Sequence, residues 1–149
     1  MIFVTVSTGH FDPLIRACAR LAPRFEFEAQ IGSGSFVPPF PHFRTGSTAQ
    51  IESKMQQAEL VITHAGTGML SMLYRLQKPC IVIPKQMRYG EANDGQVELA
   101  RKWGELQMGV LCLDVNGLEA AIEACRERNW SFPQIPSLGD GLRNDLKLV

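Results

Sequence analysis

The chain has 149 residues and a formal net charge of zero, because 15 basic side chains are balanced by 15 acidic ones. This length predicts one domain with a hydrophobic core of its own, and a composition that is 45% hydrophobic and 20% charged is globular rather than disordered. The balanced charge argues against a nucleic-acid partner, and no apolar run approaches the length of a transmembrane helix or resembles a signal peptide.

The distribution of apolar residues predicts strands that alternate with helices. Short runs rich in β-branched and aromatic residues are typical of buried strands, and the stretches between them carry apolar residues at the spacing of a helix face. In chain order, we expect strands at residues 2–7, 25–31, 42–44, 60–63, 80–83 and 110–113. We expect helices at residues 12–22, 47–58, 69–76, about 93–107 and 116–125.

Three of these helices begin with sequences that are typical of an N-terminal cap. Asp12 precedes Pro13, a residue that suits the first turn of a helix. Ser47, followed three residues later by Gln50, forms a capping box, and Asn116 is expected to cap the last helix.

Strands that are apolar on both faces and alternate with helices indicate a parallel sheet covered by helices. The predicted fold class is therefore α/β, a Rossmann-like, doubly wound parallel sheet. In such a sheet, ligands bind beyond the carboxyl ends of the strands. Here those ends lead into residues 7–10, 32–34, 64–68 and 85–96, where we expect the functional site.

The strongest local motif is His64-Ala65-Gly66-Thr67-Gly68, which lies between a predicted strand and a predicted helix. Its glycines let the backbone approach a ligand, and the first N–H groups of the helix would point at that ligand. The motif indicates a phosphate or diphosphate site. The alternative is an ordinary strand-to-helix turn whose glycines serve packing. The Ser7-Thr8-Gly9 turn has the same features in weaker form.

Other ligand motifs are incomplete. Gly32-Ser33-Gly34 resembles the start of a dinucleotide fingerprint, but Val37 occupies the third glycine position and no helix follows directly. The sequence has neither a G-K-[ST] phosphate loop nor a G-x-S-x-G nucleophile elbow. His10, His42 and His64 lie far apart without acidic partners at ligand spacing, so we expect no metal site.

Single polar residues at the strand ends leave two interpretations open. His64 contacts a ligand or is a structural histidine, and the neighbouring glycines favour the ligand. Lys85 and Arg88 neutralise a diphosphate or are ordinary solvated loop charges. The four cysteines, by contrast, all lie in apolar stretches without a C-x-x-C pair, which predicts reduced core thiols of a cytoplasmic protein.

Five segments of the sequence resemble the motifs of a known protein family in their order and spacing. They read V-T-V-S-T at 4–8, F-D-x-L-I at 11–15, A-E-L-V-I-T-H-A-G-T-G at 58–68, K-P-x-I-V-I-P at 78–84 and Y-G-E-x-N-D-x-Q-x-E-L-A at 89–100. Over residues 1 to about 125 the chain resembles the family 28 glycosyltransferase C-terminal domain. It is most similar to split members: the small subunit of bacterial exopolysaccharide β-glycosyltransferases, and the cytosolic subunit of the dolichol-linked N-acetylglucosaminyltransferase.

The resemblance implies the C-terminal, donor-binding lobe of a GT-B glycosyltransferase. Its donor would be a UDP-sugar, its acceptor a lipid-linked saccharide in exopolysaccharide biosynthesis, and its reaction an inverting transfer without metal or other cofactor. A membrane-associated partner subunit would supply the acceptor lobe and plausibly the general base. The chain would then be cytoplasmic and held at the inner face of the membrane by its partner.

The resemblance also assigns roles within the site. By the family's pattern the loop at 64–68 holds the donor diphosphate, while Gly90, Glu91, Asp94 and Gln96 approach the sugar. The expected donor-binding residues, including those of the other strand-end loops, are Ser7, Thr8, Gly9, His64, Ala65, Gly66, Thr67, Gly68, Lys85, Gly90, Glu91, Asp94 and Gln96.

The chain departs from the family pattern at several positions. Ser7 stands where the family usually has glycine, and Met72 where many members have a glutamate that contacts the ribose. Ala92 and Gly95 replace both histidines of the G-E-H-x-x-D-H-Q loop, which is also one residue shorter here. These losses favour an alternative function: a non-catalytic accessory subunit that stabilises or recruits a membrane-associated glycosyltransferase. A free-standing nucleotide-binding module is the third and least supported hypothesis.

We expect a nucleotide-sugar-binding domain at residues 1–128 and a separate tail at 129–149. Trp130, Phe132, Ile135 and Leu138 in this tail either dock on the partner or pack across the chain's own sheet.

Overall fold

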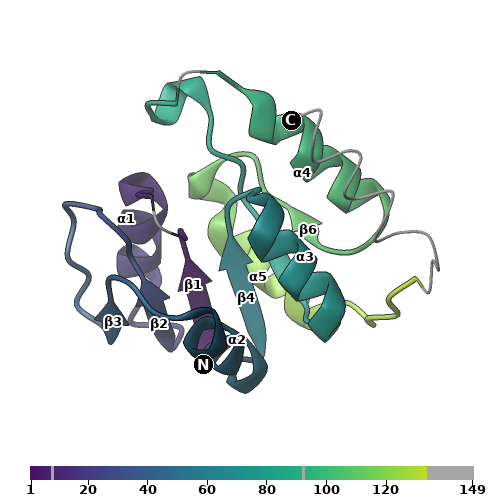
Figure 1. The fold of residues 1–149 in the computed structure, drawn as a ribbon, viewed down its shortest axis with the longest axis horizontal. Helices are drawn as coiled ribbons and strands as arrows, with labels where there is room; N and C mark the ends of the chain where they lie inside the picture. The colour runs from purple at the N-terminus through teal and green to yellow at the C-terminus, as the bar shows by residue number, and fades with distance from the viewer. Residues whose placement is uncertain (8, 92, 134–149) are drawn as a thin grey trace.

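Parallel strands form one sheet in the computed structural model, which describes residues 1–7, 9–91 and 93–133 (Figure 1). The strands are β1 (Ile2–Thr5), β2 (Phe27–Gln30), β3 (His42–Phe43), β4 (Leu60–Thr63), β5 (Cys80–Val82) and β6 (Val110–Leu111). Their order in the sheet is β3-β2-β1-β4-β5-β6, and every described pair is parallel. The predicted doubly wound α/β fold is therefore confirmed.

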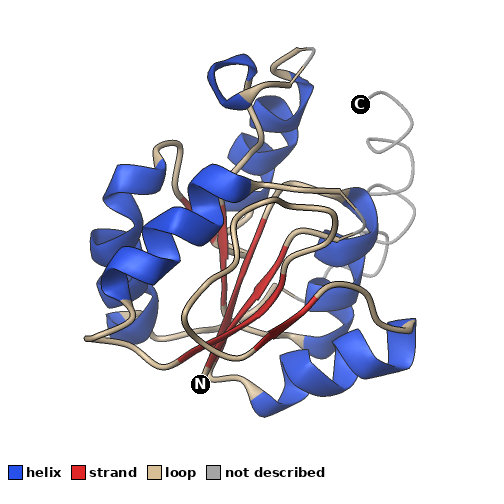
Figure 2. Ribbon diagram, turned by 90° about the vertical axis from the view of Figure 1, so that its left-hand side faces the viewer, coloured by secondary structure: helices blue, strands red, loops and turns tan. Residues whose placement is uncertain are grey.

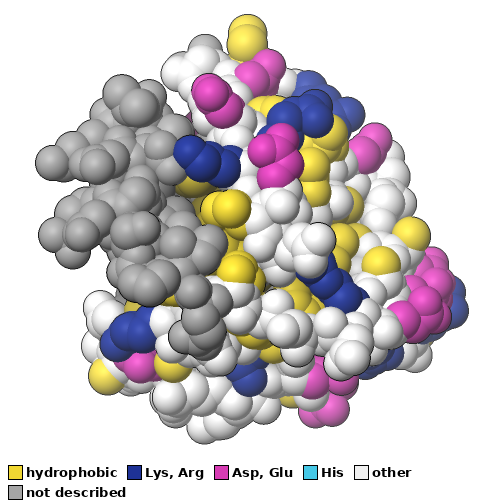
Figure 3. Space-filling view, turned by 90° about the vertical axis from the view of Figure 1, so that its right-hand side faces the viewer, with side chains coloured by type: hydrophobic (Ala, Val, Ile, Leu, Met, Phe, Trp, Pro, Cys, Tyr) yellow, Lys and Arg dark blue, Asp and Glu magenta, His cyan; other side chains and the backbone are white. Residues whose placement is uncertain are grey.

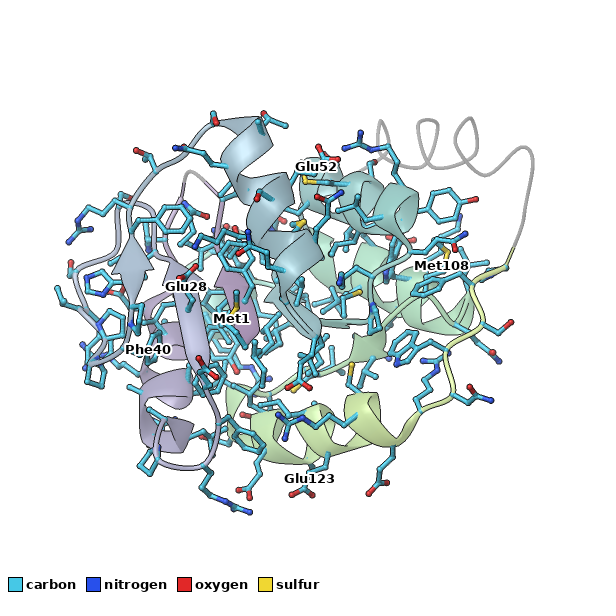
Figure 4. All side chains as sticks on the ribbon, turned by 90° about the horizontal axis from the view of Figure 1, so that it is seen from below. Met1, Glu28, Phe40, Glu52, Met108 and Glu123 are labelled. Carbon is cyan, nitrogen blue, oxygen red and sulfur yellow. The ribbon has the colours of Figure 1, made fainter. Side chains whose placement is uncertain are left out.

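Helices cover both faces of this sheet (Figure 2). They are α1 (Asp12–Leu21), α2 (Thr48–Gln57), α3 (Thr67–Leu76), α4 (Gly95–Glu105) and α5 (Leu118–Glu127), with short 3₁₀ helices η1 (Met87–Tyr89) and η2 (Val115–Gly117). One core cluster joins the sheet to α1 and α5, and a second joins it to α2, α3 and α4. Figure 4 looks from below and places Phe40, which precedes β3, and Met108, which precedes β6, at opposite sides of the molecule.

Strand β1 lies at the centre of the sheet and determines where a ligand can bind. Its Thr5 is in register with Gln30 of β2 on one side and Thr63 of β4 on the other. The chain proceeds from β1 outward to β2 and β3, and then crosses back to β4. The carboxyl ends of β1 and β4 therefore form the topological switch point of the sheet, where open α/β sheets bind ligands.

The prediction that the four cysteines are core thiols is confirmed within the described residues. Cys18, Cys80, Cys112 and Cys125 are free and buried. Burial raises the pKa of all four thiols above the ordinary value, so none is a thiolate near neutral pH.

The Ser47 capping box is confirmed, whereas the Asp12 cap is wrong. Ser47 Oγ accepts from the Gln50 N–H at 3.2 Å, and Gln50 Oε1 accepts from the Ser47 N–H at 2.8 Å. Phe11 occupies the N-cap of α1, and Asp12 is its first residue. The Asp12 carboxylate instead accepts from the Ser35 N–H at 3.1 Å, because the turn after β2 lies against the start of α1.

The Asn116 cap is also wrong, because the 3₁₀ helix η2 precedes α5. Gly117 is the N-cap of α5 and makes no side-chain hydrogen bond to it. Asp114 caps the start of η2 and accepts from the Asn116 N–H at 2.8 Å. Several predicted strands are also shorter than expected; at β1, the backbone turns away from the sheet at Ser7, where φ is +60°.

The start of the predicted tail packs on its own chain. Trp130 Nε1 donates to the Cys125 carbonyl at 2.9 Å, and its ring stacks on Phe132 at 5.4 Å. This contact favours the self-packing alternative for Trp130. Ile135 and Leu138 belong to residues 134–149, which lie outside the described residues, and the division at 128 stays a prediction.

The molecular surface agrees with the balanced composition. On the face that is seen from the right of Figure 1, basic and acidic side chains alternate over the described residues without a block of one sign (Figure 3). Among the described residues, none of the helices is both long and apolar enough to cross a membrane.

Candidate functional site

The turn after β1 is held by a buried glutamine of the neighbouring strand. Gln30 Oε1 accepts from Thr5 Oγ1 at 2.6 Å, and Gln30 Nε2 donates to the Ser7 carbonyl and, at 2.7 Å, to the Arg44 carbonyl. These contacts fix Ser7 in the left-handed backbone region, which a residue other than glycine seldom adopts. Gln30, a residue that sequence reasoning missed, therefore stabilises a serine in this conformation.

His64 follows β4 and is 7% exposed. Neither ring nitrogen makes a hydrogen bond of normal geometry within the described residues, although the Gln96 amide lies beside the ring. Burial and then the charge of Lys85 lower the His64 pKa to about 4. The imidazole is thus neutral at pH 7, with one donor and one acceptor nitrogen that a ligand can satisfy.

The two glycines of the motif have different roles. A Cβ at Gly66 would lie 2.8 Å from His64 Nε2 and even closer to His64 Cε1. The His64 ring can therefore occupy its observed position only because residue 66 is glycine. A Cβ at Gly68 would meet nothing within 4 Å, which means that open space lies beside the first turn of α3. Within the described part of the chain, no side chain caps that turn. Packing accounts for Gly66, while the space beside Gly68 suits a ligand at the positive end of the helix.

Lys85 brings the loop after β5 to the same place. Lys85 is only 9% exposed. Its Nζ lies close to Gly9, in the turn after β1, because a Cβ added at Gly9 would be 3.0 Å from this nitrogen. Its backbone N–H donates to Gln96 Oε1 at 3.0 Å. Burial lowers the Lys85 pKa, and the nearby Glu91 charge opposes this shift.

The remainder of the loop after β5 is held by its own side chains. Asp94 Oδ1 accepts from the Met87 N–H at 2.7 Å. Gln86 donates to the Leu113 carbonyl at 2.6 Å, and Tyr89 Oη accepts from the Val115 N–H at 3.1 Å. In the structure the Asp94 carboxylate thus shapes the loop, and its expected approach to a sugar stays a prediction. Gln86 and Tyr89 were missed, since their partners lie more than twenty residues away in sequence.

A cavity of about 210 Å³ adjoins the switch point. It lies between the carboxyl ends of β1 and β2 on one side and α2 and α3 on the other. Among the described residues that line it, Ser7 is the one that belongs to the predicted site. The lining residues are Ser7, Gln30, Thr45, Gly46, Thr48, Ile51, Met69 and Met72.

The structure thus brings part of the predicted set together. Described residues that gather at the switch point are Ser7, Gly9, His64, Ala65, Gly66, Thr67, Gly68, Lys85 and Gln96. Gly90 is open to solvent space, Glu91 is exposed, and Asp94 lies in the same outer loop. Thr8 and Ala92 lie outside the described residues. Over residues 1–7, 9–91 and 93–133, no three His, Cys, Asp or Glu side chains are grouped to hold a metal ion.

The Rossmann-like fold of this chain is shared with a lobe of a solved glycosyltransferase. The family model "Glycosyltransferase family 28 C-terminal domain" matches residues 1–134, so the chain belongs to this family and the sequence resemblance is confirmed. A solved structure described as the glycotransferase of kitacinnamycin has a TM-score of 0.64, covers 99% of this chain and 39% of its own, and shares 21% identity. At that identity the likeness supports the fold alone.

Two curated relatives are mammalian. The UDP-N-acetylglucosamine transferase subunit ALG13 of Mus musculus is 31% identical over 116 residues, which cover 67% of this chain. The protein of the same name from Homo sapiens is 31% identical over 117 residues, or 68% of this chain. The matched region spans 10% of each relative's length. The chain is thus similar to one part of much longer transferase subunits.

Proposed function

We propose that this chain is the donor-binding subunit of a two-component, inverting glycosyltransferase that uses a UDP-sugar. The observation that carries the proposal is the switch point itself. There open space lies beside Gly68 in the first turn of α3, the ring nitrogens of the buried His64 have no hydrogen-bond partner among the described residues, and a cavity of about 210 Å³ adjoins them.

Each part of a UDP-sugar fits a feature of this site. The diphosphate suits the N–H groups at the start of α3, together with the neutral His64 ring. The nucleoside suits the adjoining cavity, where Met69 and Met72 offer apolar surface and Thr45 and Thr48 offer hydroxyl groups. The sugar would then extend towards the loop that holds Glu91 and Asp94.

The reaction that we propose uses this position of the donor. The oxygen of an acceptor hydroxyl forms a bond to the anomeric carbon from the side opposite the diphosphate, which inverts the configuration. The bond between the anomeric carbon and the β-phosphate oxygen breaks, and its electron pair remains on UDP. The hydroxyl proton passes to a general base of the acceptor-binding chain. The start of α3 stabilises the charge that develops on UDP.

The second chain is part of this proposal. We expect it to be membrane-associated and to present a lipid-linked saccharide, so that this chain works at the cytoplasmic face of the membrane. The two mammalian relatives are named as subunits of a transferase, which supports an enzyme divided between two chains. Met72, in the position of the ribose-binding glutamate of many family members, favours the exopolysaccharide branch.

Calorimetric titration tests the proposal. UDP and UDP-sugars should bind the wild-type chain, while GDP serves as the control for base selectivity. Gly68→Asp should abolish UDP binding without unfolding the chain, because the new carboxylate enters open space and repels the diphosphate. Ser71→Asp, on the exposed side of α3, is the matched control and should bind UDP normally. No binding of UDP at millimolar concentration, with or without the partner chain, would overturn the proposal.

The accessory-subunit hypothesis rests on Ala92 and Gly95, which remove two histidines from the sugar-side loop. It predicts that Gly68→Asp and Gln96→Ala leave the transferase activity of the reconstituted pair intact. Loss of activity with either variant, when the pair still assembles, favours the donor-binding function instead.

A further inference from the structure

The cavity beside the switch point is lined by uncharged side chains over the described part of the chain. Ile51 of α2 and the pair Met69 and Met72 of α3 form its apolar wall, and Met72 is 8% exposed. The polar side chains of the lining are three hydroxyls and an amide, which belong to Ser7, Thr45, Thr48 and Gln30. Such a cavity suits an uncharged part of a ligand, which in the donor is the nucleoside.

The Gln30 amide in this lining is already engaged by neighbouring residues. Its Oε1 accepts from Thr5 Oγ1 at 2.6 Å. Its Nε2 donates to the carbonyls of Ser7 and Arg44, the latter at 2.7 Å. Because a side-chain amide has two N–H hydrogens, these two bonds use both of them. Gln30 therefore supports the wall of the cavity and has no free hydrogen to donate to a ligand.

Carboxylates on the elements beside the cavity are paired with cations outside it. Glu28 of β2 pairs with Lys54 at 2.7 Å, and Glu52 of α2 pairs with Arg75 at 3.2 Å. Neither glutamate is among the lining residues. These two groups could form strong, charge-assisted hydrogen bonds to a hydroxyl of a ligand, but both are held elsewhere.

The two methionines lie where the ribose of a nucleoside diphosphate would be. Met69 belongs to the first turn of α3 and Met72 to the second, whereas Thr48 and Ile51 line the cavity from α2. With the diphosphate at the start of α3, the ribose is the next group of the donor and would lie against the methionines. In dinucleotide-binding sheets a carboxylate holds the ribose 2′-hydroxyl. A thioether is only a weak acceptor, so this wall can hold that hydroxyl only weakly.

We propose that the site does not distinguish ribose from 2′-deoxyribose, so that sugar diphosphates of 2′-deoxynucleosides are a second class of donor for this chain. This inference rests on the proposed function, because it uses the same position of the donor. A neutral hydroxyl such as that of Thr48 would favour ribose by less than about 10-fold, whereas a carboxylate would favour it by about 10- to 100-fold.

Calorimetric titration with UDP and with 2′-deoxy-UDP tests the inference, because the two ligands differ by one hydroxyl. The wild-type chain should bind them with dissociation constants that differ by less than about 10-fold. A larger preference for UDP would overturn the inference and leave the proposed function standing. A wild type that binds neither ligand, with or without the partner chain, would overturn both.

Met72→Glu tests the position of the ribose, because it introduces a carboxylate into the methionine wall. It should raise the preference for UDP over 2′-deoxy-UDP to about 10-fold or more. Ser71→Glu adds the same charge at the exposed neighbouring position of α3 and should keep the wild-type ratio. Since Met72 is buried, Met69→Glu at a half-buried position is the second variant, and circular dichroism reports which of them fold. An unchanged ratio in the folded glutamate variants would overturn the inference.

Discussion

Two regions at the carboxyl edge of the sheet use their polar groups in opposite ways. At the switch point, the two ring nitrogens of His64 have no hydrogen-bond partner among the described residues, and Lys85 takes part in none of the ion pairs found there. In the outer loop after β5, by contrast, Gln86, Asp94 and Tyr89 satisfy backbone groups of their own chain. Buried polar groups are normally paired in a folded protein, so unpaired ones indicate where a ligand completes the structure. The polar groups that can bind a ligand therefore lie at the switch point, and the outer loop after β5 flanks this site.

The largest effect on this comparison should come from Gln30→Ala, which removes the support of the switch point. The Thr5 hydroxyl and the Ser7 and Arg44 carbonyls would lose their common partner. We expect a loss of about 3 kcal/mol in the free energy of unfolding, measured by urea denaturation. Gln57→Ala, on the exposed end of α2, is the control and should change it by less than about 0.5 kcal/mol. Equal losses of unfolding free energy in the two variants would show that the hydrogen bonds of Gln30 do not stabilise the turn after β1.

The second-largest expected effect is the pH dependence of stability that the titration of His64 causes. Its folded pKa of about 4 lies below the ordinary value of 6.5, so the unfolded chain binds more protons between these values. The free energy of unfolding should therefore fall as the pH decreases from about 6.5 towards 4, by about 2–3 kcal/mol for this group. Urea denaturation at pH 7 and at pH 4.5 measures the loss, which should be smaller in His64→Gln. An identical loss in both proteins would mean that His64 is not held neutral.

The two glycines of the motif should respond differently to alanine. Gly66→Ala forces the Cβ into the His64 ring and should lower the free energy of unfolding by about 1–3 kcal/mol. Gly68→Ala places the Cβ in open space within the first turn of α3 and should change stability by less than about 1 kcal/mol in either direction. Chemical denaturation measures the free energy of unfolding of both variants. Equal destabilisation would contradict the conclusion that Gly66 serves packing while Gly68 leaves space for a ligand.

The smallest effect should come from the outer loop. Asp94→Ala removes an exposed hydrogen bond to the Met87 N–H, so we expect a loss of about 0.5–1 kcal/mol in the free energy of unfolding. Asp94→Asn keeps an acceptor at that position and should restore most of the loss. If Asp94→Ala destabilised the chain as much as Gln30→Ala, the two regions would not differ as described.

Sequence patterns predicted the fold well because its determinants are local. The apolar run of β4 and the capping box at Ser47 can be read within a few residues, and both occur as expected. Asp12 failed as a cap because a turn more than twenty residues away competes for its carboxylate. Gln30 and the orientation of Lys85 depend likewise on which strands become neighbours. The positions of the site loops were thus predictable, while the contacts that hold them were not.

A crystal structure of the chain with UDP tests the central claim most directly. The account predicts that the diphosphate lies at the start of α3 beside Gly68, with His64 and Lys85 Nζ within hydrogen-bond distance of its oxygens. The nucleoside should occupy the cavity lined by Thr45 and Met72. A diphosphate bound away from the β1 and β4 loops, or an empty cavity beside bound UDP, would contradict it.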